Sequence, residues 1–98
     1  MLHITQVIYL HPGPEAEQSF LEFESRVLPL MSNHGGELLL RLRPQKEQKI
    51  EGSLEPPFEV HLVSFPSEES LAAYLNDPER LKYLHLKEQA IREAVVYR

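Results

Sequence analysis

Three segments of the chain alternate between apolar and polar positions in the way that β-strands do. They are Leu2–Leu10, Glu37–Arg43 and Phe58–Phe65. Because successive side chains of a strand point to opposite faces, even-numbered and odd-numbered positions should form two faces of a sheet. We expect the protein's own helices to cover the even face, and the odd face to meet a second subunit, a ligand or both.

The two faces differ in character. The even positions are almost all apolar: Leu2, Ile4, Ile8, Leu10, Leu38, Leu40, Leu42, Phe58, Val60 and Leu62. The odd positions mix polar and large apolar residues: His3, Thr5, Val7, Tyr9, Leu39, Arg41, Arg43, Glu59, His61, Val63 and Phe65. The odd face carries too many large apolar groups to be a surface that is exposed only to solvent.

The first helix is predicted between the first two strands. Apolar residues between positions 20 and 31 recur at three- and four-residue spacing, which is typical of one buried helix face. Pro14 suits the first turn of this helix, and Pro29 should kink it. The pair Gly35-Gly36 should end it, since glycine accepts the left-handed conformation found after a helix C-terminus.

A second, broken helix is predicted after the third strand. Ser67 resembles an N-cap, and the sequence Asn76-Asp77-Pro78 should interrupt the helix, because the residue before a proline avoids helical angles. A further helical piece is expected from Pro78 to about Ile91. The segment Ala94–Tyr97 then reads as a short last strand.

The resulting order is strand, helix, strand, strand, helix, strand. This order predicts an α+β, ferredoxin-like domain over residues 1–98, with a four-stranded antiparallel sheet and both helices on one face. The connection Pro44–Pro57 is polar and long for a loop. Residues 46–50 could extend the preceding strand as an arm. The connection as a whole is either a wet hairpin tip, or a mobile lid or dimer arm.

Composition excludes several classes of function. The chain of 98 residues has a net charge of −5, and its ten Lys and Arg residues are scattered, which argues against binding nucleic acid. There is no cysteine for a disulfide, a thiolate nucleophile or a cysteine zinc site. No signal peptide and no membrane-spanning apolar run is evident, so the cytoplasm is the expected compartment.

Short motifs along the whole chain carry a family resemblance. They are Val27-Leu28-Pro29-Leu30, His34-Gly35-Gly36, Ile50-Glu51-Gly52, Phe65-Pro66-Ser67 and Tyr74-Leu75-Asn76-Asp77-Pro78-Glu79. With them the chain resembles the dimeric α/β-barrel superfamily, and within it a family of short bacterial proteins of unassigned function. The resemblance implies a homodimer in which two subunits pack open sheet face to open sheet face. The superfamily includes cofactor-free monooxygenases and isomerases, but none of their catalytic signatures is evident here.

The histidines are the candidate catalytic residues. His3 and His61 are expected to share the odd face, where Glu59 would complete a metal or acid–base cluster. The alternative is that they form hydrogen bonds across a dimer interface. His85 beside the broken second helix is a third candidate base, whereas His34 is expected to be a helix-end histidine favoured by the helix dipole.

The candidate ligand-binding residues are Arg41, Tyr9, Tyr74 and Tyr83. Arg41 could hold an anionic substrate or form an ion pair with Glu59 or with the partner subunit. Tyr74 and Tyr83 could line a cleft between helix and sheet, or be core residues with a wet hydroxyl group. No metal site and no cofactor is predicted.

Three functions remain open from the sequence. The first is binding of a small metabolite, anionic or aromatic, in a cleft between helices and sheet. The second is an enzyme, a cofactor-independent monooxygenase or isomerase acting on an activated ring substrate, which needs a base and a partner for the resulting anion. The third is a non-catalytic structural or interaction module whose odd face is buried by the dimer.

Overall fold

A computed structural model describes residues 1–98, and it confirms the ferredoxin-like order of elements. The elements are β1 (Leu2–Leu10), α1 (Pro14–Val27), the 3₁₀ helix η1 (Leu28–His34), β2 (Glu37–Leu42), the 3₁₀ helix η2 (Lys46–Gln48), β3 (Glu59–Phe65), α2 (Glu68–Leu75), α3 (Pro78–Leu81), α4 (Leu84–Ala90) and β4 (Ile91–Tyr97). The strands form one antiparallel sheet in the order β2-β3-β1-β4.

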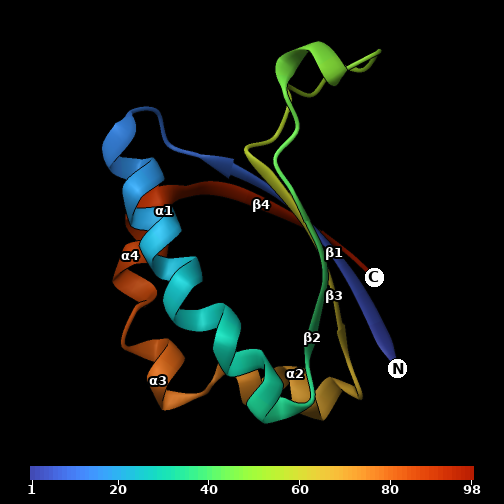
Figure 1. Cartoon of the computed structure of the whole chain (residues 1–98), viewed down its shortest axis with the longest axis vertical. Coiled ribbons are helices and arrows are strands. Elements are labelled where there is room, and N and C mark those ends of the chain that lie inside the picture. The colour runs from blue at the N-terminus through green and yellow to red at the C-terminus, as the bar shows by residue number, and fades with distance from the viewer.

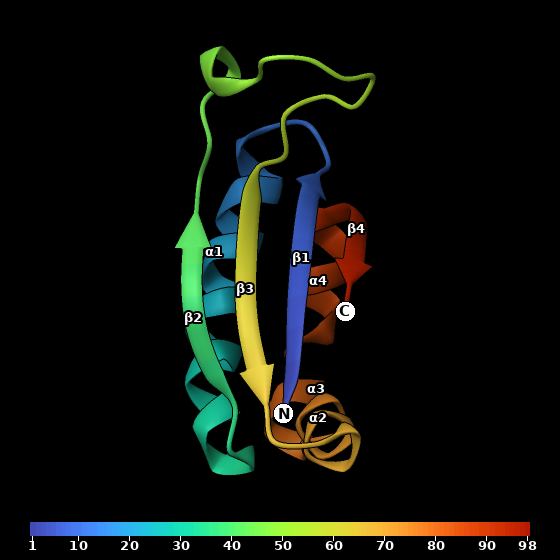
Figure 2. The same cartoon turned by 90° about the vertical axis from the view of Figure 1, so that its right-hand side faces the viewer.

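All helices of the two crossovers lie on one face of the sheet (Figure 1). Figure 2 looks onto the other face, which no helix covers, so we call it the open face. The connection between β2 and β3 projects beyond the end of the sheet in both views. It contains the short helix η2 in place of the strand extension considered for residues 46–50. No helix is long and apolar enough to cross a membrane.

Local signals in the sequence explain where the helices begin and end. The Ser67 side chain accepts a hydrogen bond from the backbone N–H of Ser70 at 3.1 Å, as an N-cap should. α1 changes into the tighter helix η1 beside Pro29, which lacks the backbone donor of a continuing α-helix. Gly35 ends η1 in the left-handed conformation, with a φ of 72°.

The C-terminal part of the chain differs from the prediction. The last helix ends at Ala90, and β4 begins at Ile91 rather than at Ala94. The apolar side chain of Ile91 has the spacing expected of the preceding helix, but Ile91 pairs with Leu10 of β1. Pairing in the sheet therefore overrides the helical pattern at this position. As a result, β4 runs along most of β1.

The predicted assignment of faces is correct for β1 and wrong for β3. Cross-strand partners share a face of the sheet. Gln6 pairs with His61, and Ile8 pairs with Glu59, so the even positions of β1 and the odd positions of β3 lie together under the helices. An even or odd residue number does not indicate the same face in two different strands, because the pairing of each strand sets its register separately.

The assignment also fails in β2, where an irregularity changes the phase. Leu38 pairs with Val63, but Leu40 pairs with Leu62, which leaves Leu39 as an extra residue. From there on, Arg41 lies on the helix-covered face opposite His61, and Leu40 and Leu42 lie on the open face. The predicted polar and apolar faces are therefore exchanged from Leu40 onwards, whereas Leu38 lies on the predicted face.

These registers make the open face far more apolar than expected. Its residues include Thr5, Val7, Tyr9, Leu40, Leu42, Val60, Leu62, Val95 and Tyr97. Leu40 and Leu42 are 47% and 48% exposed. Val63 and Phe65, which were expected on this face, are instead buried in the core beneath the helices.

The helix-covered core consists of two apolar clusters. The larger one contains Ile4, Met31, Val63, Phe65, Leu71 and Tyr74, and the smaller one contains Ile8, Phe20 and Ala90. Along β1, Gln6 lies between Ile4 and Ile8, and its cross-strand partner is His61. A polar layer therefore separates the two clusters, and the candidate site lies in it.

Candidate functional site

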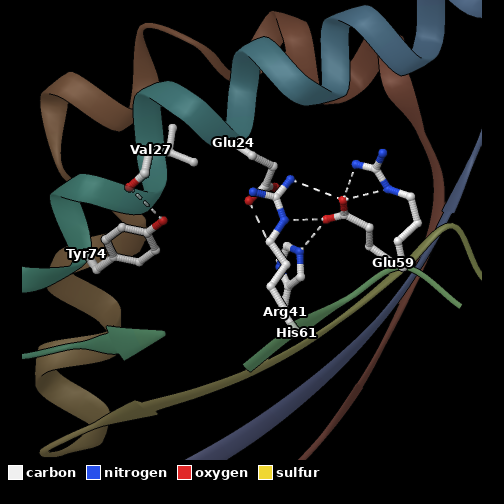
Figure 3. A network of polar contacts seen from close by, with 7 residues as sticks. Glu24, Val27, Arg41, Glu59, His61 and Tyr74 are labelled. Atoms are coloured by element: carbon white, nitrogen blue, oxygen red, sulfur yellow. Dashed lines mark hydrogen bonds and ion pairs between the residues drawn. The ribbon is translucent and has the colours of Figure 1, made fainter. Parts of the chain in front are cut away.

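Two arginines and a histidine converge on the carboxylate of Glu59 (Figure 3). Arg41 donates from Nε to Glu59 Oε1 at 2.7 Å, and from Nη2 to Oε2 at 3.2 Å. Arg43 donates to Oε2 from Nε at 3.1 Å and from Nη2 at 2.5 Å. His61 Nε2 lies 2.8 Å from Oε1. Arg41 and Arg43 thus form the ion pairs with Glu59 that the sequence left as one alternative.

Burial determines the charge states in this network. Glu59 and His61 are only 2% and 1% exposed. Burial pushes the pKa of Glu59 upward, but the hydrogen bonds from Arg41, His61 and Arg43 outweigh it and lower that pKa. Burial lowers the pKa of His61 although Glu59 opposes the change. A neutral His61 therefore donates its Nε2–H to an ionised Glu59, which leaves Nδ1 as an acceptor.

Glu24 of α1 faces that acceptor nitrogen. Its Oε2 lies 4.0 Å from His61 Nδ1, and the residue is 5% exposed. Burial raises the pKa of Glu24 to about 7, although the positive charge of Arg41 opposes the rise. Glu24 can therefore gain or lose a proton near neutral pH, while Glu59 stays ionised.

A cavity of about 730 Å³ lies between the helices and the sheet, and Glu24 is part of its wall. It is lined by 19 residues, of which 14 are hydrophobic. They come from α1, η1, α2, α3 and α4 on one side, and from β1, β3 and β4 on the other. Ala94 and Val96 of β4 line it but remain exposed, so the cavity opens to solvent beside β4.

Two polar side chains of the broken second helix also line this cavity. The Tyr74 hydroxyl donates a hydrogen bond to the Val27 carbonyl at 3.2 Å (Figure 3). The Arg80 guanidinium lies 5.2 Å from the ring centroid of Tyr74 and 5.7 Å from that of Phe23. Arg80 donates from Nη1 to the Leu75 carbonyl at 3.3 Å, but its buried Nε has no partner.

The predicted site residues divide between these features and other places. Arg41 and His61 belong to the Glu59 network, and Tyr74 lines the cavity. His3 pairs with Ser64 and lies on the open face, opposite to His61, so the predicted His3–His61 cluster does not form. The structure contains no group of three or more His, Cys, Asp or Glu side chains that could hold a metal ion.

The remaining candidates lie outside the cavity. Tyr9 is on the open face, and its hydroxyl donates to the Glu55 carbonyl at 3.1 Å. Tyr83 lies beneath the Arg26 guanidinium at 5.7 Å, and His85 is exposed on α4. His34, at the end of η1, contacts Asp77 Oδ2 at 2.8 Å and lowers the pKa of Asp77.

Glu24 and Arg80 are the site residues that sequence reasoning missed. Glu24 follows Phe20 by four positions and precedes Val27 by three, so it lies within the apolar stripe of α1. A charged residue at a buried helix position is a signal that could have found it. Arg80 has no such signal, because only folding brings α3 against the cavity.

Comparison with solved structures shows the same fold in proteins of low sequence identity. A protein of unknown function from Rhodopseudomonas palustris has a TM-score of 0.81 and 15% identity, over 97% of this chain and 77% of that chain. A DABB family protein with a ferredoxin-like fold from Mesorhizobium loti has a TM-score of 0.67 and 12% identity, over 97% and 90% of the two chains.

A third structure is described as a dimeric ferredoxin-like protein of unknown function, from Jannaschia sp.. It has a TM-score of 0.67 and 17% identity, over 98% of this chain and 96% of that chain. The comparison with curated proteins gives no match. A family model described as "Domain of unknown function (DUF1330)" matches residues 13–97. The chain therefore belongs to this family, within a ferredoxin-like fold that includes dimeric proteins.

Proposed function

We propose that this protein binds a small, mostly apolar metabolite in the cavity between the helices and the sheet. The observation that carries the proposal is the cavity itself, about 730 Å³ in volume, with mainly hydrophobic walls and the buried carboxyl group of Glu24. Ligand sites commonly have volumes of roughly 300–1,000 Å³ and combine apolar walls with a few polar groups. Of the predicted ligand-binding residues, Tyr74 has the position for this role.

A second candidate function is proton transfer on the bound molecule, as in the predicted isomerase. The observation that favours it is the series of contacts that runs from Glu59 through His61 towards Glu24. The pKa of Glu24 is about 7, so this group can exchange a proton at neutral pH. A general acid or base works best when its pKa lies near the working pH. In this candidate function, Glu24 exchanges a proton with the bound molecule. His61, which is hydrogen-bonded to Glu59, orients the carboxyl group of Glu24.

We also propose that two copies of the chain associate through the open face. The support is a sheet surface on which no helix packs and on which Leu40 and Leu42 are about half exposed, although the β2–β3 connection contacts it at Tyr9. Apolar patches of this kind mark interaction sites. The Jannaschia protein of the same fold is described as dimeric, which favours a second copy as the partner.

The cavity proposal can be tested with a variant that fills the cavity. Ala94 lies on its exposed wall, so Ala94→Phe should occupy the space without entering the packed core. The matched control is Ala73→Phe, which makes the same change on the exposed surface of α2. The uncharged probes are indole and 1-naphthol, and their binding is followed by amide shifts in ¹H–¹⁵N NMR spectra.

We expect saturable shifts at cavity residues in the wild type and in Ala73→Phe, and their loss in Ala94→Phe. Native mass spectrometry of protein purified without added ligand provides a second readout, in which a retained small mass would identify a natural ligand. Shifts that persist unchanged in Ala94→Phe, or that lie only on the open face, would overturn the cavity proposal.

A further inference from the structure

The cavity has an excess of positive charge that the rest of the chain does not neutralise. Arg80 of α3 and Lys87 of α4 line it, and neither forms an ion pair with a carboxylate. Arg98 also lines it but is paired with Glu68. The only carboxyl group in the wall is Glu24, which is largely protonated below about pH 7. A cavity with two unpaired cations favours an anionic occupant.

Arg80 is held in place with an unused donor. Its guanidinium lies against the rings of Phe23 and Tyr74, and one nitrogen donates to the Leu75 carbonyl. The buried Nε is the one buried side-chain polar atom of the chain without a hydrogen-bond partner. Native proteins satisfy nearly all such groups, so an orphaned donor in a cavity wall needs an explanation. This Nε is enclosed by the chain, so a ligand oxygen reaches it only when the Arg80 side chain shifts, although Arg80 as a residue lines the cavity.

The apolar walls restrict what else the ligand can be. Most lining residues are hydrophobic, so the body of the ligand must be apolar and its charge must lie at one end, near α3 and α4. A carboxylate suits this end, because guanidinium groups bind carboxylates with good geometry and strength. Highly charged or extended polar molecules would leave unpaired groups against the apolar walls.

Glu24 adds a condition on binding. An ionised Glu24 would repel a carboxylate in the same poorly solvated space, whereas a protonated Glu24 would not. The charged and titratable groups that face Glu24 are Arg41 of β2, Glu59 and His61 of β3, Arg80 of α3 and Lys87 of α4. Of these, Glu59 is held ionised by its arginines and His61 is held neutral by burial. Proton uptake would therefore occur at Glu24.

We propose that the ligand is a small organic acid with an apolar body, bound as its carboxylate by Arg80 and Lys87 while Glu24 carries a proton. The inference rests on the proposed function, because it names the class of ligand for the same cavity. It differs from the sequence expectation, in which Arg41 would bind an anion, since Arg41 is already engaged by Glu59.

The test uses pairs of probes that have the same shape and differ in charge. They are benzoate and benzamide, cinnamate and cinnamamide, and 1-naphthoate and 1-naphthamide, titrated calorimetrically or by NMR. At pH 6 we expect the best-fitting acid to bind at least about tenfold more tightly than its amide. Arg80→Gln should remove this preference by weakening the binding of the acid, and its ¹H–¹⁵N NMR spectrum shows whether the variant is folded.

Lys87→Gln provides a second cavity variant, and we expect it to reduce the preference in the same direction. Lys82→Gln is the matched control, because Lys82 is exposed, pairs with Glu79 and does not line the cavity. Between pH 6 and pH 8 the affinity of the acid should fall about tenfold, since only molecules with protonated Glu24 bind it. In Glu24→Gln this fall should disappear.

Each contrary result has a distinct meaning. Amides that bind as tightly as acids would overturn the organic-acid inference and leave the cavity proposal intact. A preference for acids that survives in both Arg80→Gln and Lys87→Gln would also overturn it. If no acid binds, while indole or 1-naphthol binds in the cavity, the inference is wrong and the proposed function stands. If neither the acids nor the neutral probes bind, both are wrong.

Discussion

At the scale of single residues, Glu24 shows how folding can make an ordinary carboxyl group sensitive to neutral pH. Glu24 is buried, and its pKa is about 7 rather than 4.5. In the folded chain Glu24 therefore binds a proton at pH values at which the unfolded chain has released it. Stability linked to this group is present at low pH and is lost as the pH rises from about 4.5 through about 7.

We therefore predict that Glu24→Gln becomes more stable relative to the wild type as the pH rises. The relative gain between pH 5 and pH 8 should reach about 3 kcal/mol at most, from the size of the pKa change. Urea denaturation of both proteins at pH 5, 6, 7 and 8 measures it. His61 has a lowered pKa and therefore adds stability as the pH rises, which is the opposite trend. Both proteins contain His61, so subtracting their free energies of unfolding at each pH removes its contribution. A difference that does not change with pH would contradict the prediction.

Sequence reasoning recovers the individual residues of the site unevenly. His61, Arg41 and Tyr74 are visible as candidates because histidine, arginine and tyrosine are unusual in strands and helices that are otherwise apolar. Glu24 was detectable as a charged residue in an apolar helical stripe. The role of Arg80 depends on how a four-residue helix packs against distant side chains, which periodicity does not encode.

At the scale of elements, the ends of helices were the most predictable parts of the structure. The caps and breaks at Ser67, Pro78 and Gly35 act through neighbouring residues, so the local sequence specifies them. Strand faces were less predictable, because they depend on pairing between distant segments. One extra residue at Leu39 was enough to exchange the faces of the rest of β2.

The N-cap of α2 gives a prediction at this scale. Ser67→Ala should reduce the free energy of unfolding by about 1 kcal/mol, because it removes the side-chain acceptor for the Ser70 N–H. Ser67→Asn should retain most of the stability, since asparagine is an equally good N-cap. Urea denaturation at pH 7 compares the three proteins. Equal stability of Ser67→Ala and the wild type would show that the cap contributes nothing.

At the scale of the whole molecule, the sheet has two faces with separate tasks in our proposals. The helix-covered face holds the cavity and the Glu59 network, and the open face carries the leucines proposed for dimerisation. The sequence predicts a covered face and an interaction face, but assigns several strand residues to the wrong one. The prediction of a dimer thus rests on different residues than first expected.

We predict that Leu40→Asp combined with Leu42→Asp converts the proposed dimer into a monomer. Charges at these positions would have to be buried without partners if the open faces packed together. Light scattering after size-exclusion chromatography measures the mass. Leu21→Asp on α1, where Leu21 is 39% exposed, is the matched control and should leave the mass unchanged. A monomeric wild type, or a double variant with the same mass as the wild type, would refute the proposed interface.

The phase of β2 has a consequence for how this family can tolerate change. Residues 40 to 43 alternate between the faces: Leu40 and Leu42 point to the open side, and Arg41 and Arg43 reach Glu59 on the other. Deleting Leu40 would move Arg41 and Arg43 to the open face, away from the buried carboxylate, and would turn Leu42 towards that carboxylate. Insertions and deletions should therefore be rare in β2 and common a few residues later, in the projecting connection, although both belong to the same hairpin.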